Sequence, residues 1–344
     1  MMTLAISAWS AISPYGYGRD AFADGINARV DPSVPAGPEL SVPDERACLV
    51  PDFDVRELLG TKGTRAMDRL SALAVCTAGQ LIDDIGLESL DDTGVVFGTT
   101  IGSAQSMMDM TRTSLQAEKP YFVQPANVPH CVMNSAAGQI AIWHQLRGPN
   151  ATIAADRATG LKALHYARRL LMNGRARQVL CGAAEEYSHA RSWLEYHRRG
   201  QNQVTGEGCA MLLLEPEAAA RRPLAYLVDV RSSMCLDGDF AATMDAEVRR
   251  LLAAHEIEAA QVWAATGDEP ATLEKLFGDE VVNRVAAVDL IGDTAAASSV
   301  FGVAAVLSAA AVDPSSAGRF AVVGSVADDN SVACALLQLP GGTP

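Results

Sequence analysis

The sequence lacks the patterns that carry metal, redox or nucleotide chemistry. Its seven cysteines are an odd number, none are spaced as a CxxC pair, and most lie in apolar runs such as 179–181 and 208–211. It contains no HExxH motif and no P-loop motif, so metalloprotease and phosphate-loop chemistry have no support. We therefore expect no metal and no cofactor, and we expect reduced, buried cysteines in a cytoplasmic protein.

Positive charge is also scarce. The chain has 27 Lys and Arg against 41 Asp and Glu, which gives a formal net charge of −14. This acidity argues against nucleic acid or an anionic membrane surface as a partner. Residues 1–4 lack the basic region of a signal peptide. We also expect no membrane span, which needs a run of about 18 apolar residues.

Strand and helix patterns alternate along most of the 344 residues, and hydrophobic residues make up 49% of them. Short β-rich apolar runs predict buried strands, and apolar residues at helical spacing predict helices. The predicted strands lie at 4–8, 94–98, 178–186, 206–215, 225–230, 261–265 and 320–323. The predicted helices include 66–85, 245–255 and 292–311. The order repeats in two halves and implies two mainly parallel sheets with helices on their faces.

The segment 148–161 contains the most specific local pattern. A Gly-Pro turn leads into a short apolar strand at 151–155, which turns sharply at Asp156-Arg157 into an amphipathic helix. A strand that turns directly into a helix presents the turn's side chain to a pocket, as in a nucleophile elbow. The nearby helix N-terminus would stabilise an anion. However, the residue at the tip is Arg157, whose guanidinium stays protonated and cannot act as a nucleophile.

This segment resembles the active-site segment of β-ketoacyl synthases, the condensing enzymes of fatty-acid and polyketide synthesis. In that family the elbow reads roughly Thr-Ala-Cys-Ala-Ser-Gly, and the cysteine is acylated. When 148–150 and Gly160 are aligned with the family, the cysteine position falls on Arg157. The resemblance covers nearly the whole chain. It implies an α/β fold of the thiolase type, with duplicated βαβαβ halves in five α-β-α-β-α layers, divided here into 1–220 and 221–344.

The other catalytic positions of the family are also replaced in this chain. A ketosynthase uses two histidines beside its cysteine to stabilise the enolate and the oxyanion. The resemblance places Thr266 and Asp293 at these positions and Val326 at a gating phenylalanine, and none of the six histidines aligns with a catalytic one. Joint loss of these residues, with the fold-bearing glycines kept, is typical of a non-catalytic paralogue. In type II polyketide synthases such a partner is the chain-length factor, or ketosynthase β subunit, which the chain resembles most.

The resemblance implies partners and a role as well as a fold. A chain-length factor pairs with an active ketosynthase α subunit, works with an acyl carrier protein that holds the acyl chain, and shapes the acyl tunnel. We therefore expect a subunit that is not catalytic alone and that controls polyketide or fatty-acyl chain length. Two alternatives stay open: a homodimeric acyl-binding or scaffold protein, and an acyltransferase or hydrolase of altered chemistry. The last would need a base and a nucleophile that the sequence does not reveal.

The resemblance also places a dimer interface and a tunnel. The strand at 151–155 is expected to pair edge to edge with its mate, since a short apolar strand is poorly suited to a free edge. Met107, Met110 and Met133 are expected along the inter-subunit acyl tunnel, because methionine is flexible and apolar. Ordinary core methionines would produce the same pattern.

The degenerate site itself predicts an ion pair. Arg157 and Asp293 would face the cavity that holds the catalytic residues of a ketosynthase, as one cation and one anion. A lone buried guanidinium is expensive to desolvate, and a carboxylate is its natural partner. We therefore predict a buried Arg157–Asp293 salt bridge, with Thr266 completing the hydrogen bonds. The alternative partners are Asp156, Glu185 or a carbonyl oxygen.

Overall fold

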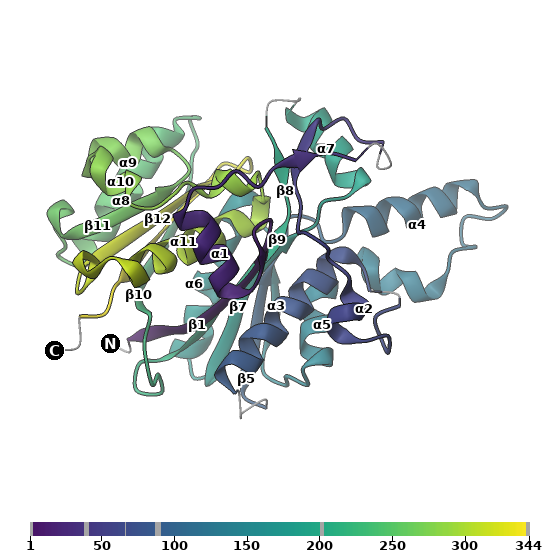
Figure 1. Ribbon diagram of the computed structural model, residues 1–344, viewed down its shortest axis with the longest axis horizontal. Coiled ribbons are helices and arrows are strands. Elements are labelled where there is room, and N and C mark those ends of the chain that lie inside the picture. The colour runs from purple at the N-terminus through teal and green to yellow at the C-terminus, as the bar shows by residue number, and fades with distance from the viewer. Residues whose placement is uncertain (1–2, 38–40, 66, 87–90, 200–202, 342–344) are drawn as a thin grey trace.

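The computed structural model describes residues 3–37, 41–65, 67–86, 91–199 and 203–341. A mixed ten-stranded sheet forms its centre (Figure 1). Along the sheet the strands follow the order β11 (Val262–Gly267), β12 (Phe320–Val326), β13 (Ser331–Gln338), β10 (Ala225–Met234), β1 (Leu4–Ser13), β9 (Gly208–Pro216), β7 (Gln178–Glu185), β5 (Thr93–Gly98) and β6 (Asn150–Ile153), with β2 (Gly16–Tyr17) paired to β1. A second, three-stranded sheet contains β3 (Val34–Pro35), β4 (Arg46–Cys48) and β8 (Thr205–Gly206).

The large sheet consists of two similar halves. One half has the order β6-β5-β7-β9-β1 and the other has β11-β12-β13-β10. They join where Leu4–Ile6 of β1 pair antiparallel with Ala225–Leu227 of β10. The prediction of two mainly parallel sheets was wrong, because only the β5–β6, β5–β7 and β11–β12 pairs of this sheet are parallel. Strands such as β13, which the sequence analysis missed, return directly beside their predecessor and must run antiparallel.

Helices cover both faces of the sheet and fill the space between its halves. In the first half α3 (Arg69–Ile85) and α5 (Ser135–Trp143) pack on the outer face. In the second half α8 (Phe240–Ala254) and α9 (Pro270–Phe277) do the same. Between the halves lie α6 (Thr159–Met172) and α11 (Ser298–Val312), with α1 (Gly18–Asn27) beside them. These are the five expected layers.

The central helix α11 corrects one expectation from the sequence. The stretch Ala295–Val312 is 18 residues long with a mean hydropathy of 1.9, so by length and composition it could cross a membrane. The expectation that no apolar run reaches this length was therefore wrong. However, 83% of the stretch is buried inside the structure. A core helix has the same composition and burial, so the stretch is weak evidence for a membrane span.

Local signals explain where the predicted elements begin and end. The helix predicted from residue 66 is α3, which begins at Arg69 after Asp68 accepts a hydrogen bond from the Ser71 N–H (2.8 Å); residue 66 lies outside the described residues. It ends at Gly86 in the left-handed conformation. In the irregular region 27–63, the described residues form short elements such as α2 (Val55–Leu59).

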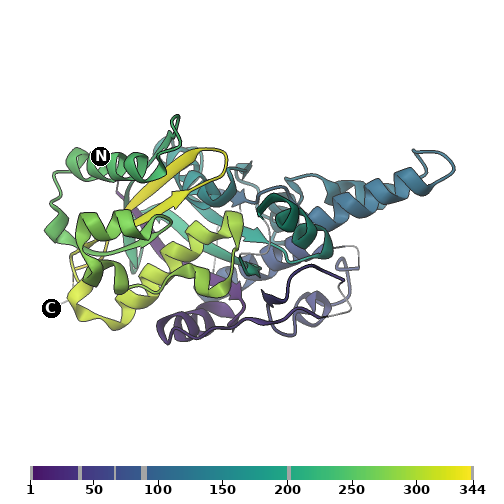
Figure 2. The same ribbon diagram turned by 90° about the horizontal axis from the view of Figure 1, so that it is seen from above.

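An arm projects from the body of the molecule at residues 104–131 (Figures 1 and 2). It consists of α4 (Ala104–Gln116) and the returning 3-10 segment η2 (Pro125–Cys131). Ala104 is the buried residue of α4, while Leu115, Tyr121 and Phe122 near the tip are exposed. The arm therefore carries apolar surface that the chain itself does not cover. At the base of α4 lies α7 (His189–Arg199).

Candidate functional site

A strained elbow positions Arg157. Strand β6 ends at Ile153, and the 3-10 turn η3 (Asp156–Ala158) leads directly into α6. Asp156 has a φ of 44°, a conformation that costs energy for a residue with a side chain. Gly160 allows α6 to approach α11 closely, because a Cβ there would lie 2.4 Å from the Val300 Cγ2. The elbow predicted from the sequence is therefore present, and Arg157 is its central residue.

A second elbow from the other half of the chain faces the first. The turn η6 (Ala295–Ala297) leads into α11, and Ala295 has a φ of 39°. The Ser299 hydroxyl at the start of α11 donates to the Arg157 carbonyl oxygen (3.1 Å). Asp293 lies just before this second elbow, and Asp268 follows the end of β11. The site is thus assembled from both halves of the fold.

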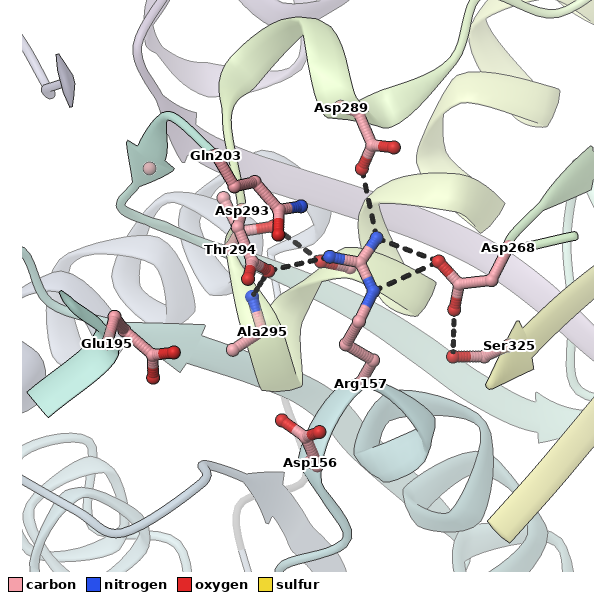
Figure 3. Close-up of polar contacts among 12 residues, drawn as sticks. Asp156, Arg157, Glu195, Gln203, Asp268, Asp289, Asp293, Thr294, Ala295 and Ser325 are labelled. Atoms are coloured by element: carbon pink, nitrogen blue, oxygen red, sulfur yellow. Dashed lines mark hydrogen bonds and ion pairs between the residues drawn. The ribbon is translucent and has the colours of Figure 1, made fainter. Parts of the chain in front are cut away.

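The Arg157 guanidinium contacts three aspartates (Figure 3). Its Nη1 lies 2.6 Å from the Asp293 Oδ1, and its Nη2 lies 2.9 Å from the Asp289 Oδ1. Its Nε and Nη2 lie 3.0 Å and 2.8 Å from the Asp268 Oδ1. The predicted Arg157–Asp293 salt bridge is confirmed. Thr266, expected to complete the hydrogen bonds, is not among the guanidinium's partners in the described part of the chain.

Further partners hold the carboxylates of Asp268 and Asp293. The other oxygen of Asp268 accepts hydrogen bonds from the Ser325 hydroxyl (3.0 Å) and the Val326 N–H (2.8 Å). The Asp293 Oδ2 lies 2.7 Å from the Arg199 Nη1. Both aspartates are therefore fixed by two or more groups, and their carboxylates cannot turn toward a substrate without breaking these contacts.

The charges in this ion network hold one another in the ionised state. Burial alone would lower the pKa of the Arg157 guanidinium, but the carboxylates of Asp268, Asp293 and Asp289 outweigh it and raise that pKa above its ordinary value. Burial alone would raise the pKa of Asp293, but the positive charges of Arg157, Arg191 and Arg199 and the Ala295 N–H lower it overall. At the elbow, the site is a cation enclosed by carboxylates.

A hollow of about 440 Å³ lies beside the ion network. Arg199, Val204, Asp289 and Asp293 contribute to its wall together with Gln203. Asp289 has a side chain that is 61% exposed, whereas that of Arg157 is 8% exposed. The hollow therefore reaches the outer carboxylates, and the guanidinium lies behind them.

The other predicted site residues do not form one group: the methionines lie at the arm, and Val326 lies at the ion network. Met107 and Met133 are exposed on or beside the arm. Met110 lines a cavity of about 280 Å³ at the base of the arm. Val326 does not lie with these methionines, because its N–H contacts Asp268 in the ion network.

The sequence analysis missed Asp268, Asp289 and Arg199. Two signals pointed to the first two: Asp268 stands two residues after Thr266, and Asp289 stands four residues before Asp293. Acidic residues next to the aligned catalytic positions are natural partners for a cation at the elbow. Arg199 lies on α7 and carried no such signal.

Comparison with known proteins identifies relatives of the chain. Residues 18–220 match the family model of the "Beta-ketoacyl synthase, N-terminal domain". A 3-oxoacyl-(acyl-carrier-protein) synthase 2 of Vibrio harveyi is 34% identical over 145 residues, which are 41% of this chain and 35% of that protein. A putative polyketide beta-ketoacyl synthase 2 of Streptomyces virginiae is 27% identical over 257 residues, 64% of this chain and 61% of that protein. The match to the Vibrio protein thus spans about a third of its length.

Solved structures extend the similarity to the whole chain. The ishigamide ketosynthase/chain length factor is 41% identical with a TM-score of 0.95, over 98% of this chain and 100% of that chain. A beta-ketoacyl synthase from Burkholderia phymatum has a TM-score of 0.82 at 18% identity, over 98% of this chain and 100% of that chain, which shows the fold alone. This chain therefore has the thiolase-like ketosynthase fold and belongs to the β-ketoacyl synthase family.

Proposed function

We propose that this chain is a non-catalytic ketosynthase-like subunit, a chain-length factor that pairs with an active ketosynthase and shapes the acyl tunnel of the complex. The observation that carries the proposal is the state of Arg157. The nucleophile position holds a guanidinium that contacts Asp268, Asp289 and Asp293. A guanidinium that remains protonated cannot form the acyl-enzyme intermediate of a condensing enzyme.

The surrounding groups do not replace the missing chemistry. Thr266 and Asp293 occupy the positions that the resemblance assigns to the two histidines, and both are buried. The Asp293 carboxylate is an acceptor held by Arg157 and Arg199, so it cannot donate a hydrogen bond to an enolate or an oxyanion. Condensation would then take place on the partner subunit.

A partner surface is available where the family's dimer interface is expected. β6 ends the strand order of the large sheet, and its Asn150 side chain donates to the Ala137 carbonyl oxygen of α5 (2.8 Å). On α5, Ile142 is 74% exposed. An open strand edge beside exposed apolar side chains is a natural place for another chain to pair. The similarity to a ketosynthase/chain length factor over the whole chain supports the same partner.

We also propose that the complex works with an acyl carrier protein that holds the acyl chain, and that it is located in the cytoplasm. One solved structure with this fold is described as a type II PKS acyl-carrier protein in complex with its ketosynthase, with a TM-score of 0.79 and 14% identity, over 98% of this chain and 99% of that chain. The seven cysteines of this chain are free, which suits a reducing compartment.

Size-exclusion chromatography after co-expression with a cysteine-containing ketosynthase tests the pairing. We expect a heterodimer with the wild-type chain. Ile142→Glu should abolish it, because a charge would be buried in the interface. Val312→Glu is the matched control, since Val312 is 71% exposed at the end of α11, and it should leave the heterodimer intact. A stable monomer that ignores the ketosynthase would refute the proposal, and a stable homodimer would favour the scaffold alternative.

Product length tests the tunnel in the reconstituted complex. Met107→Ala should lengthen the product, because it removes apolar volume from the proposed tunnel wall. Met107→Trp should shorten the product, because it adds volume. Mass spectrometry of the products measures both effects. If both variants give the wild-type distribution, Met107 does not limit chain length.

A further inference from the structure

The cavity at the base of the arm combines apolar and polar walls. It has a volume of about 280 Å³ and is lined by residues of α4, of the returning segment and of the start of α3. Met110 and Val123 contribute apolar surface. His130 and Asn127 of η2 contribute polar surface. The other lining residues are polar as well, so Met110 and Val123 form an apolar patch in a largely polar lining made by Asp68, Ser106, Asp109, Thr113, Gln124, Asn127 and His130.

His130 is the polar group whose orientation is fixed. Its Nδ1 lies 3.1 Å from the Asp68 Oδ2, and its side chain is 11% exposed. Asp68 is itself held, because it accepts hydrogen bonds from the Ser71 N–H (2.8 Å) and hydroxyl (2.7 Å). The imidazole Nε2 has no hydrogen-bond partner among the described residues. One buried ring nitrogen is therefore oriented by Asp68, and the other is available to a ligand in the cavity.

The charged groups around the cavity restrict the ligand. Asp109 is engaged, because its Oδ1 accepts from the Gln105 Nε2 (2.9 Å) and lies 3.3 Å from the Arg112 Nη1. Asp68 is engaged by Ser71 and His130. These carboxylates would repel an anionic ligand. Because they already have hydrogen-bond partners, an ammonium group would form few additional contacts with them. A neutral ligand fits best.

We propose that this cavity binds a hydroxyl group carried on an apolar acyl chain, with the His130 Nε2 as its hydrogen-bond partner. A hydroxyl can donate to a neutral imidazole nitrogen and can accept from a protonated one, whereas a ketone can only accept. Met110 and Val123 contact the apolar part of the chain. The inference rests on the proposed function in one respect only, the choice of an acyl chain as the carrier of the hydroxyl.

Two esters that differ by one hydroxyl test the inference on the full chain. Methyl 8-hydroxyoctanoate and methyl octanoate are titrated separately, and binding is followed by calorimetry and by the nitrogen resonances of labelled histidines. We expect the hydroxylated ester to bind about five- to tenfold more tightly, as one buried hydrogen bond implies. We also expect it alone to shift the His130 Nε2 resonance. Equal affinity, no binding, or an unshifted resonance would overturn the inference.

Variants of His130 separate a binding role from a structural one. His130→Gln keeps a group that can donate and accept, so it should keep most of the preference for the hydroxylated ester. The histidine resonance that disappears in this variant also identifies the resonance of His130. His130→Phe should abolish the preference. His255→Phe is the matched control, because His255 also pairs with an aspartate, Asp229 (3.2 Å), in the other half of the chain, and it should change neither affinity. If His130→Phe still prefers the hydroxylated ester, His130 is not the hydrogen-bond partner of the hydroxyl group.

If His130→Phe does not fold, the resonance of the wild-type protein decides the question. Neither measurement requires a partner subunit. A hydroxyl preference without heterodimer formation would overturn the proposed function alone. A heterodimer without hydroxyl preference would overturn this inference alone.

Discussion

Arg157 places a full positive charge in the centre of the molecule, with 8% of its side chain exposed. Moving an unpaired charge from water to such a buried position costs on the order of several kcal/mol of desolvation free energy. Asp268 and Asp293 offset that cost, because Asp293 is also buried, the side chain of Asp268 is only 20% exposed, and both are held by further donors. The network need not make the protein more stable than an apolar core would, but each buried member depends on the others.

Asp293→Ala should lower the free energy of unfolding by about 3–5 kcal/mol, because it leaves Arg157 and Arg199 without a shared buried partner. Asp289→Ala should cost about 1 kcal/mol or less, since its carboxylate is 61% exposed and water replaces it. Urea denaturation measures both. The double change Arg157→Met with Asp293→Leu should recover only part of the loss, because Asp268 then lacks its cation. Equal stability of the two single variants would contradict this view.

At the level of elements, the arm is joined to the body through buried acids. Glu186 follows β7 and is 1% exposed. It accepts hydrogen bonds from the Gln105 N–H (3.1 Å) and the Ser103 hydroxyl at the start of α4. Burial is the main reason that the pKa of Glu186 is raised to about 7; the nearby carboxylates of Asp68 and Glu185 also raise it, whereas the hydrogen bonds from Gln105 and Ser103 lower it. The N-terminus of α4 is thus held by a group that titrates near neutrality.

The stability that Glu186 contributes should fall as the pH rises from about 5 to about 7. Its pKa is raised from 4.5 to about 7 in the folded protein, so in this range the folded state binds more protons than the unfolded state, and rising pH favours unfolding. Compared with Glu186→Gln, the wild-type protein should therefore lose stability across this window. Glu118→Gln, an exposed change on the same arm, should follow the wild type. A constant difference between wild type and Glu186→Gln would refute the assignment.

At the scale of the whole molecule, the ion network joins the two halves. Arg157 comes from the first half, and Asp268, Asp289 and Asp293 come from the second. The elbows before α6 and α11 meet where the halves pack together. The ion network therefore depends on the packing of the two halves against each other.

Arg157→Cys alone should restore no condensing activity. The new thiol would lie near Asp293 and Asp268 rather than two histidines, and neighbouring carboxylates disfavour a thiolate. Decarboxylation of malonyl-loaded carrier protein and condensation by the isolated chain measure this, with an intact ketosynthase as the positive control. Product formation by Arg157→Cys above the wild-type level would mean that the site retains catalytic machinery.

The sequence by itself determined the local features. The elbow depends on a short apolar strand, a turn and an amphipathic helix within 148–161, so it could be recognised from neighbouring residues. The same applies to α3, because Asp68 and Gly86 mark its ends. The Arg157–Asp293 pair was predicted because the resemblance placed both residues in one cavity and opposite charges must pair when buried.

Only the tertiary structure decided features that depend on residues far apart in the chain. The large apolar stretch Ala295–Val312 is a core helix because two halves of the sheet enclose it. Asp268, which directly follows the end of β11 at Gly267, contacts Arg157, whereas Thr266 inside the strand is not among the partners of the guanidinium in the described part of the chain. Arg199 joins the site from 94 residues before Asp293. Such contacts follow from packing, which local sequence patterns do not encode.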